Sequence, residues 1–310
     1  MDLLRGMTQS LRAVADLLLP RTCIVCEKSL HPDQEHLCSG CLADLPLTRF
    51  HLLRHNPMAD RFNDIIQKYL EEQWAATIRT ASTAKKSGTM KSNEEATARI
   101  CATLENNSDS VDNFQSFQHE RYAFSLALFL YNSESDYRHI THRIKYHADL
   151  KAGDYFGRML GREIMAAEWL QDVDTIVPVP LHWTREWSRG YNQAEVIARA
   201  VAKELDVPLR TDILKRTRRT KTQTKVGIAG KGTNVRDAFR VQPAGTSQRH
   251  SPKHSIKRHD AHKDAITHIL LIDDVFTTGS TLGECFKALR KVYPPSVRIS
   301  VATLGFVGGA

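Results

Sequence analysis

Residues 269 to 282 read Ile-Leu-Leu-Ile-Asp-Asp-Val-Phe-Thr-Thr-Gly-Ser-Thr-Leu. The four opening residues are apolar, as a parallel strand buried on both faces requires. Leu282, Phe286 and Leu289 then recur at helical spacing. The stretch therefore predicts a buried strand, a hydroxyl-rich turn and a helix, which together form the repeating unit of an α/β sheet.

The turn of this unit brings polar groups to the amino end of a helix. There backbone N–H groups lack partners and the helix dipole favours an anion. The turn supplies four hydroxyls and a glycine, at Thr277, Thr278, Gly279, Ser280 and Thr281. Asp273 and Asp274, just before it, can accept hydrogen bonds from two ribose hydroxyls or help hold a hydrated Mg²⁺. The pattern predicts a site for a phosphorylated sugar.

Two other interpretations of the stretch remain open. The strand could end in solvated acids, with Ser280 or Thr281 only capping the next helix. An aspartyl phosphoacceptor also needs acids at a strand end, but it needs no cradle of hydroxyls for a phosphate already attached to a sugar. The pattern resembles the diphosphoribosyl-binding motif of type I phosphoribosyltransferases, in which strand, acid pair, hydroxyls and glycine fall in this order.

The composition is that of a soluble globular protein. The 310 residues allow one large or two smaller domains, and 25% charged and 41% hydrophobic residues are ordinary values. No apolar stretch approaches the ~20 residues that cross a bilayer. Residues 1–20 have the pattern of an amphipathic helix rather than a signal peptide. We expect a cytoplasmic location.

Positive charge is concentrated in one region. Between Arg210 and Lys263, fifteen Lys and Arg stand against three Asp, a net charge of +12, which leaves −4 for the rest of a chain whose total is +8. A concentrated basic segment indicates a polyanionic partner, either nucleic acid or a highly phosphorylated ligand. For residues 242–263 a solvated, disordered loop without a partner is an open alternative, because Ser, Pro, His and Lys dominate there.

Four of the six cysteines form two Cys-x-x-Cys pairs, Cys23 with Cys26 and Cys38 with Cys41. Each pair can place two sulfurs on one side of a tight turn, and four thiolates form a closed tetrahedral shell that suits structural zinc. Two disulfides are the alternative, but a reducing cytosol disfavours them. The module could contact nucleic acid or serve as a structural clip.

The rest of the chain alternates strands and helices. Strands are expected at 122–131, 175–179, 238–241, 268–272 and 297–304, and helices at 134–147, 152–170, 192–205 and after residue 280. This order predicts a parallel sheet with flanking helices and right-handed crossovers. The predicted domains are 1–52, with the zinc module, 53–120, a helical insertion or linker, and 121–310, with a basic insertion at 242–266.

Arginines follow the strand expected at 175–179. Arg185 and Arg189 are candidate ligands for a diphosphate, because a guanidinium offers paired donors to phosphate oxygens. Asn192 is either a further ligand or a helix cap. Taken alone, the stretch could also be a loop with exposed arginines, although this is the weaker alternative.

A basic, glycine-bearing stretch follows at residues 216–234. Its candidate binding residues are Arg216, Arg219, Thr220, Gln223, Lys231 and Asn234. Such a loop could close as a hood over a bound diphosphate and exclude water. It could instead lie along a nucleic-acid backbone.

Together these motifs resemble the competence protein ComF family of bacteria. The matching elements are Leu19-Pro20-x-x-Cys23-x-x-Cys26, the stretch 142–147, Pro178-Val-Pro-Leu-His182, Arg189-Gly-Tyr-Asn-Gln193, Thr220-x-x-Gln223, Asn234-Val235-x-x-Ala238-Phe239 and the stretch 271–281. Residues 53–120 and the insertion near 243–266 depart from the family pattern, and Lys231 stands where the family commonly has arginine. The resemblance implies a zinc module joined to a type I phosphoribosyltransferase-like fold.

The resemblance also implies a function and partners. Family members are associated with natural transformation and with imported single-stranded DNA, and their phosphoribosyl diphosphate site, with Mg²⁺, can serve for binding without a known transfer reaction. We therefore expect phosphoribosyl diphosphate, single-stranded DNA and proteins of the DNA-uptake machinery as partners. The alternatives are an active phosphoribosyltransferase, acting on a nucleobase or an amine, and a purely structural zinc adaptor.

Overall fold

The computed structural model describes residues 21–86, 120–181, 190–217, 238–241 and 266–308. The helix expected at 1–20 and the basic stretches at 218–237 and 242–265 lie outside these ranges. Within the described ranges, no helix is both long and apolar enough to span a membrane.

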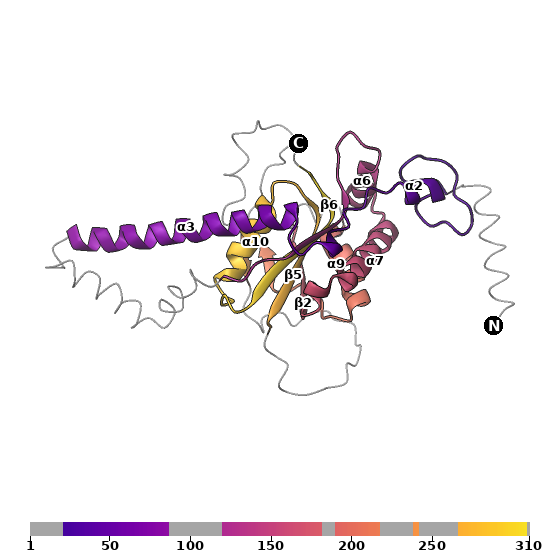
Figure 1. The fold of residues 1–310 in the computed structure, drawn as a ribbon. Helices are drawn as coiled ribbons and strands as arrows, with labels where there is room; N and C mark the ends of the chain where they lie inside the picture. The colour runs from indigo at the N-terminus through magenta and orange to yellow at the C-terminus, as the bar shows by residue number, and fades with distance from the viewer. Residues whose placement is uncertain (1–20, 87–119, 182–189, 218–237, 242–265, 309–310) are drawn as a thin grey trace, which may run out of the picture.

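A parallel sheet forms the centre of the molecule (Figure 1). Its four strands are β1 (Ser125–Leu130), β6 (Arg298–Phe306), β5 (His268–Phe276) and β2 (Thr175–Pro178), adjacent in that order. The first five residues of β5 and the last eight of β6 are buried, because helices cover both faces. The parallel α/β sheet predicted from the sequence is confirmed.

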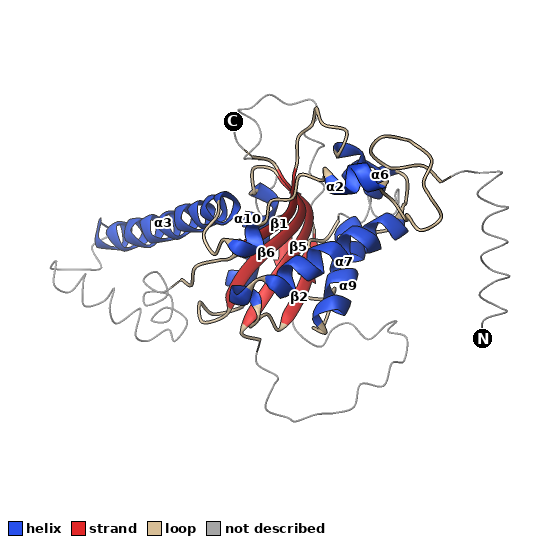
Figure 2. Cartoon of the chain, turned by 45° about the vertical axis from the view of Figure 1, so that its right-hand side comes forward, coloured by secondary structure: helices blue, strands red, loops and turns tan. Residues whose placement is uncertain are grey.

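Two pairs of helices cover the sheet. Helices α7 (Leu150–Ala166) and α9 (Gln193–Leu205) lie side by side on one face, and α3 (Pro57–Lys86) and α10 (Ser280–Arg290) lie on the other (Figure 2). Glycines let α7 approach α9 closely: a Cβ on Gly157 would lie 2.7 Å from the Cβ of Ala200. The described helices also include α2 (Ser39–Ala43), α6 (Arg138–Tyr146) and the 3₁₀ turns at Phe50–Leu52 and Glu168–Leu170.

The start of α3 belongs to the core, although its residues depart from the family pattern. Asn56 caps the helix by accepting hydrogen bonds from the backbone of Met58 and Ala59, at 3.1 and 3.0 Å. The buried ring of Phe62 meets that of Phe286 edge-on, with centroids 6.1 Å apart. Farther along, α3 projects away from the sheet (Figure 1). A domain boundary between residues 52 and 121 stays a prediction, because residues 87–119 are outside the described ranges.

One strand runs well past its expected end, and another was not expected. The strand expected at 268–272 continues through the acid pair to Phe276, because Val275 and Phe276 still pair with Gly305 and Phe306 of β6. A second, antiparallel pair joins β3 (Leu214–Arg216) to β4 (Phe239–Val241). The sequence predicted β4 but placed Arg216 in a loop.

Candidate phosphosugar site and cysteine cluster

The acid pair lies near the carboxyl end of β5, a central strand, where open α/β sheets bind ligands. Asp274 is buried and Asp273 is half-buried. Burial and the neighbouring carboxylate of Asp274 raise the pKa of Asp273 to about 7, although Lys145 and Arg216 act in the opposite direction. Near neutral pH Asp273 is therefore partly protonated, and an added cation would favour its ionised form.

Lys145, on α6, reaches the acid pair from another part of the chain. Its Nζ atom lies 2.7 Å from Oδ2 of Asp274. Burial alone would lower the pKa of Lys145, but the carboxylate of Asp274 and then that of Asp273 raise it overall, so the ammonium stays charged. The sequence did not assign Lys145 a role. The only signal was its place in the family-like stretch at 142–147.

The hydroxyl turn connects β5 to α10. The side chains of Thr277 and Thr278 are exposed, and the hydroxyls of Thr278 and Ser280 lie 2.8 Å apart. Gly279, with φ of 72°, is the N-cap and has no side chain with which to cap α10, but the hydroxyl of Thr278 accepts a hydrogen bond from the backbone N–H of Ser280 at 3.4 Å. Ser280 and Thr281 therefore lie in the first turn of α10 and do not act as caps. Exposed hydroxyls and helix-start N–H groups form the arrangement expected around a phosphate.

Side chains of α3 and β5 pack closely against this turn. A Cβ atom on Gly279 would lie 2.6 Å from Cδ1 of Ile65 and 2.7 Å from Cζ of Phe276. Gly283, one helical turn later, leaves room for the same isoleucine, since its Cβ would lie 2.6 Å from Cγ2 of Ile65. Helix α3 thus supports the turn and the first turn of α10.

The remaining predicted ligands fall into three groups. Asn192 caps α9, accepting from the backbone of Ala194 and donating to the carbonyl of Val179, both at 3.1 Å. Arg216 places its guanidinium 5.1 Å from the ring centroid of Phe239, and its charge acts on Asp273. The others lie outside the described residues: Arg185, Arg189, Arg219, Thr220, Gln223, Lys231 and Asn234.

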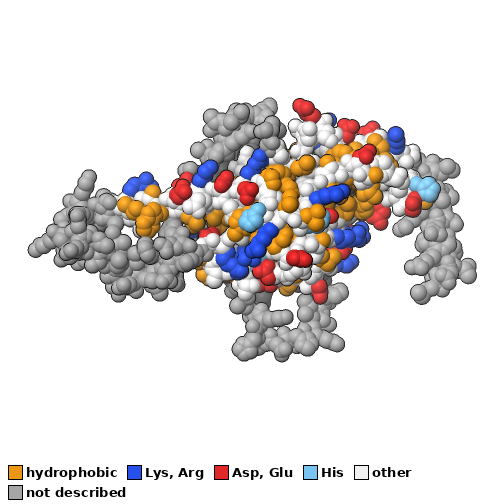
Figure 3. Space-filling view, in the orientation of Figure 1, with side chains coloured by type: hydrophobic (Ala, Val, Ile, Leu, Met, Phe, Trp, Pro, Cys, Tyr) orange, Lys and Arg blue, Asp and Glu red, His pale blue; other side chains and the backbone are white. Residues whose placement is uncertain are grey.

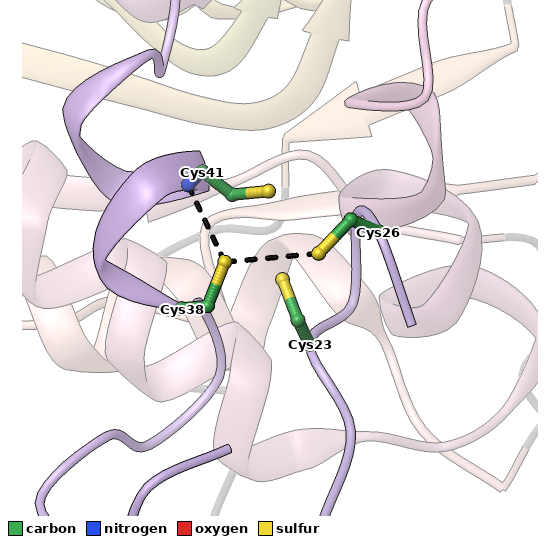
Figure 4. Close-up of side chains that lie close together, drawn as sticks. All are labelled: Cys23, Cys26, Cys38 and Cys41. Carbon is green, nitrogen blue, oxygen red and sulfur yellow. Dashed lines mark hydrogen bonds between the residues drawn. The ribbon is translucent and has the colours of Figure 1, made fainter. Parts of the chain in front are cut away.

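The cysteine pairs converge as the spacing predicted (Figure 4). The sulfurs of Cys23, Cys26, Cys38 and Cys41 all lie within 4.8 Å of one another, and those of Cys26 and Cys38 are 3.7 Å apart. A tetrahedral zinc site with Zn–S bonds of ~2.3 Å needs sulfurs roughly 3.8 Å apart. All four are free thiols, so the disulfide alternative is not what the structure contains.

The pKa shifts of the cysteines in this cluster also favour a bound cation. Burial opposes ionisation of Cys23, but hydrogen bonds from the backbone of Cys26, Cys38 and Val25 lower its pKa to about 7. Burial and the other sulfurs raise the pKa of the Cys41 thiol. Four thiolates can therefore coexist only around a cation, which makes the cluster suitable for a bound metal.

The cysteine module rests on the larger domain through several contacts. The hydroxyl of Tyr137, the residue before α6, donates to the carbonyl of Cys41 at 3.0 Å. The rings of His36 and Tyr155 lie 5.3 Å apart, and Glu35 forms a 3.6 Å ion pair with Arg158. Helix α6 thus contacts the module at one end and the acid pair at the other.

Comparison with known proteins finds a family that part of the chain resembles. Residues 192–304 match the family described as phosphoribosyl transferase domain. This part of the chain, which contains β3, β4, β5 and most of β6, is similar to that family. None of the solved structures matches the chain.

Two kinds of curated relative are similar to this chain. Competence protein F of Haemophilus influenzae is 32% identical over 138 residues, which cover 44% of this chain and 53% of that relative. The DNA utilization proteins YhgH of Escherichia coli K12 and Salmonella typhimurium are 26% and 28% identical over 163 residues, 52% of this chain and 63% of theirs. The alignments thus span between half and two thirds of these relatives. The predicted resemblance to the ComF family is confirmed.

Proposed function

We propose that this protein is a cytoplasmic ComF-like protein that binds phosphoribosyl diphosphate with Mg²⁺ and handles single-stranded DNA during DNA uptake. One observation carries the first half: an acid pair, a half-buried lysine and a hydroxyl turn at a helix start lie together at the carboxyl end of β5. A phosphorylated sugar offers the complementary groups, vicinal hydroxyls and an anionic phosphate.

The proposed roles follow the chemistry of each group. Asp273 and Asp274 would accept the ribose hydroxyls and help hold hydrated Mg²⁺, which supplies positive charge to the diphosphate. The turn at 277–281 would hold the 5-phosphate. Arg185 and Arg189, with Asn192 as the helix cap beside them, would contact the diphosphate. Residues 216–234 would form the hood.

The DNA half rests on charge and on the relatives. Residues 210–263 contain fifteen Lys and Arg. On the face in Figure 3, acidic and basic side chains of the described residues are interspersed. The relatives are named for competence and for DNA utilization. A basic segment in such a protein suits the phosphates of imported single strands.

The cysteine cluster is proposed as a structural zinc site. Four thiolates without an open position bind zinc and hold a small module that has little core of its own. The contacts of Tyr137 and Arg158 with the module suggest that it is docked rather than loosely tethered. Proteins of the DNA-uptake machinery are the expected protein partners.

Calorimetry with phosphoribosyl diphosphate and Mg²⁺ tests the sugar site. We expect binding to the wild type and loss of binding in the Asp273→Asn/Asp274→Asn variant, with the zinc content unchanged as a control for folding. No binding to the wild type at millimolar ligand would overturn the proposal. Affinity for single-stranded DNA should fall steeply with salt, because neutralising phosphates releases counterions.

An active phosphoribosyltransferase is the second candidate. The match of residues 192–304 to the transferase domain favours it. Release of diphosphate on adding a nucleobase or an amine would establish that reaction, and the Asp273→Asn/Asp274→Asn variant would then lose it.

A further inference from the structure

Three arginines lie around the ring of Phe124, which is 2% exposed and comes just before β1. The guanidinium carbon of Arg298, the first residue of β6, lies 4.5 Å from the ring centroid, and that of Arg54 lies 5.3 Å from it. Arg121, three residues before the ring, is close enough for its charge to act on Arg298. We call Arg54, Arg121 and Arg298 the arginine cluster. It lies at the amino ends of the strands.

The arginine cluster contains more positive charge than the described acids balance. Burial is the main cause that lowers the pKa of Arg298, and Arg121 and Arg54 lower it further, whereas Asp172 acts in the opposite direction. Among the described residues Asp172 is the one acid in an ion pair with the cluster, 3.1 Å from Arg298, and its other oxygen contacts His268. A further anion would therefore reduce the repulsion among the three cations.

Two of the three arginines can still bind a ligand. Arg298 is paired with Asp172, and only 13% of its side chain is exposed. Arg54 is exposed and has no hydrogen-bond or ion-pair partner within the described part of the chain. Arg121 is half-buried and donates one hydrogen bond, to the carbonyl of Ser296 at 3.3 Å. Because a guanidinium has five N–H donors in a planar fork, Arg54 and Arg121 can each hold phosphate oxygens.

The basic insertion joins the domain next to the arginine cluster. Residues 242–265 contain five Lys and Arg and four His against two Asp, and Ile266 and Thr267 lead from them into β5. The carbonyl of Thr267 accepts a hydrogen bond from the backbone N–H of Arg298 at 2.8 Å. A basic stretch of sequence is thus connected to the same edge of the sheet as the arginine cluster. This arrangement indicates a polyanion rather than a single small anion.

We propose that Arg54 and Arg121 bind backbone phosphates of a single nucleic-acid strand at the amino edge of the sheet. The proposal rests on the DNA-handling half of the proposed function and gives it a contact within the described residues. Guanidinium groups that hold phosphates read no base edges, so the contact should accept any sequence. A strand is favoured over an acidic protein segment because the basic insertion extends over many residues, and a strand carries a negative charge at every nucleotide.

The arginine cluster and the phosphosugar site lie toward opposite ends of the same strands. Arg298 begins β6, and Thr303, five residues later, pairs with Asp273 of the acid pair. Five residues of strand span roughly 16 Å. A nucleic-acid strand on Arg54 and Arg121 would therefore leave the phosphosugar site open, and the protein can hold both ligands at once.

The test compares charge variants of the full-length, zinc-loaded protein. Fluorescence anisotropy over a salt series would measure the affinity for an oligo-dT strand and for an abasic strand of the same length. In Arg54→Gln/Arg121→Gln we expect the slope of log affinity against log salt to become shallower by about 1.4, at roughly 0.7 for each lost phosphate contact. The change should be equal for both strands, because the contact is to phosphates and not to bases. Arg54→Lys/Arg121→Lys should keep most of the slope, since it keeps both charges.

The matched control is Arg162→Gln/Arg199→Gln. It removes the same charge from α7 and α9, where these side chains are 64% and 69% exposed. Its salt slope should equal that of the wild type. Zinc content and phosphoribosyl diphosphate binding should stay at the wild-type level in every variant, which would show that the variants are folded.

Several results would overturn the proposal. One is a wild-type salt slope in Arg54→Gln/Arg121→Gln, and another is the same change in the matched control, which would mean that only net charge matters. A larger loss for oligo-dT than for the abasic strand would assign the two arginines to bases. Displacement of oligo-dT by polyglutamate at an equal charge concentration would assign them to an acidic protein segment. If the wild type binds neither strand at low salt, this proposal and DNA handling fail together, while calorimetry with phosphoribosyl diphosphate still tests the acid pair.

Discussion

Lys145 and Asp274 form an ion pair of 2.7 Å that joins α6 to β5, with 8% of the aspartate side chain exposed. Replacing the lysine by methionine would leave a buried carboxylate uncompensated beside a second one. We expect Lys145→Met to lower the free energy of unfolding by about 3 kcal/mol, the lower end for breaking a buried pair, since the lysine is partly exposed. Urea unfolding measures this, with Lys145→Arg as the control that keeps the charge. An unchanged midpoint for Lys145→Met would show that the pair contributes nothing.

The affinity for the Mg²⁺-bound sugar diphosphate should depend on pH. Burial and Asp274 raise the pKa of Asp273 to about 7 in the free protein, and a bound cation would favour its ionised form. Affinity should therefore rise as pH increases through about 7, level off above it, and fall up to about tenfold per pH unit below it. Calorimetry in buffers of different ionisation enthalpy would detect the released proton. Asp273→Asn should abolish this proton release, and the same release in that variant would assign it to another group.

Alanine substitutions at Gly279 and Gly190 distinguish the backbone cost of a side chain at positive φ from the steric cost of a clash with neighbouring atoms. Both have positive φ, 72° and 77°, but a Cβ on Gly279 would clash with Ile65 and Phe276, whereas a Cβ on Gly190 would have no atom of the described residues within 4 Å. Gly190→Ala should cost about 1 kcal/mol of stability from the backbone alone, and Gly279→Ala about 2 to 4 kcal/mol. Thermal unfolding compares the two variants. Equal losses would mean that the packing of α3 against the turn does not constrain it.

The cysteine cluster should bind one zinc ion per chain through all four sulfurs. Cys26→Ser should lose most of the metal and the protection of residues 21–45 from proteolysis, because the module depends on the metal for its fold. Cys285→Ala, which removes a buried thiol of α10, should keep the metal. Elemental analysis of reduced protein measures the content. Full zinc in Cys26→Ser would remove that cysteine from the ligand set.

Local patterns in the sequence predicted much of the fold. The apolar run before Asp273 located β5, because a strand that is buried on both faces is apolar at every position. The helical spacing after Ser280 located α10, because a helix that is buried on one face is apolar at every third or fourth position. The spacing of the cysteines predicted a cluster that the structure brings within 4.8 Å. These features depend on residues that lie close together in the sequence.

Features that depend on distant contacts were missed. Lys145 meets Asp274 only because α6 packs at the carboxyl edge of the sheet. The continuation of β5 to Phe276 depends on pairing with β6, and the role of Ile65 depends on two glycines of another helix. Each of these features depends on a contact with a distant part of the chain, and the local sequence pattern does not indicate such a contact.

Helix α6 and the residue before it contact both the cysteine cluster and the acid pair. Tyr137 before it holds the carbonyl of Cys41, and Lys145 near its end holds Asp274. Nine residues at about 1.5 Å each make this helix roughly 13 Å long. If a metal and the sugar diphosphate bind at these two proposed sites, reciprocity fixes the size of any coupling between them: any factor by which the sugar tightens metal binding is the factor by which the metal tightens sugar binding.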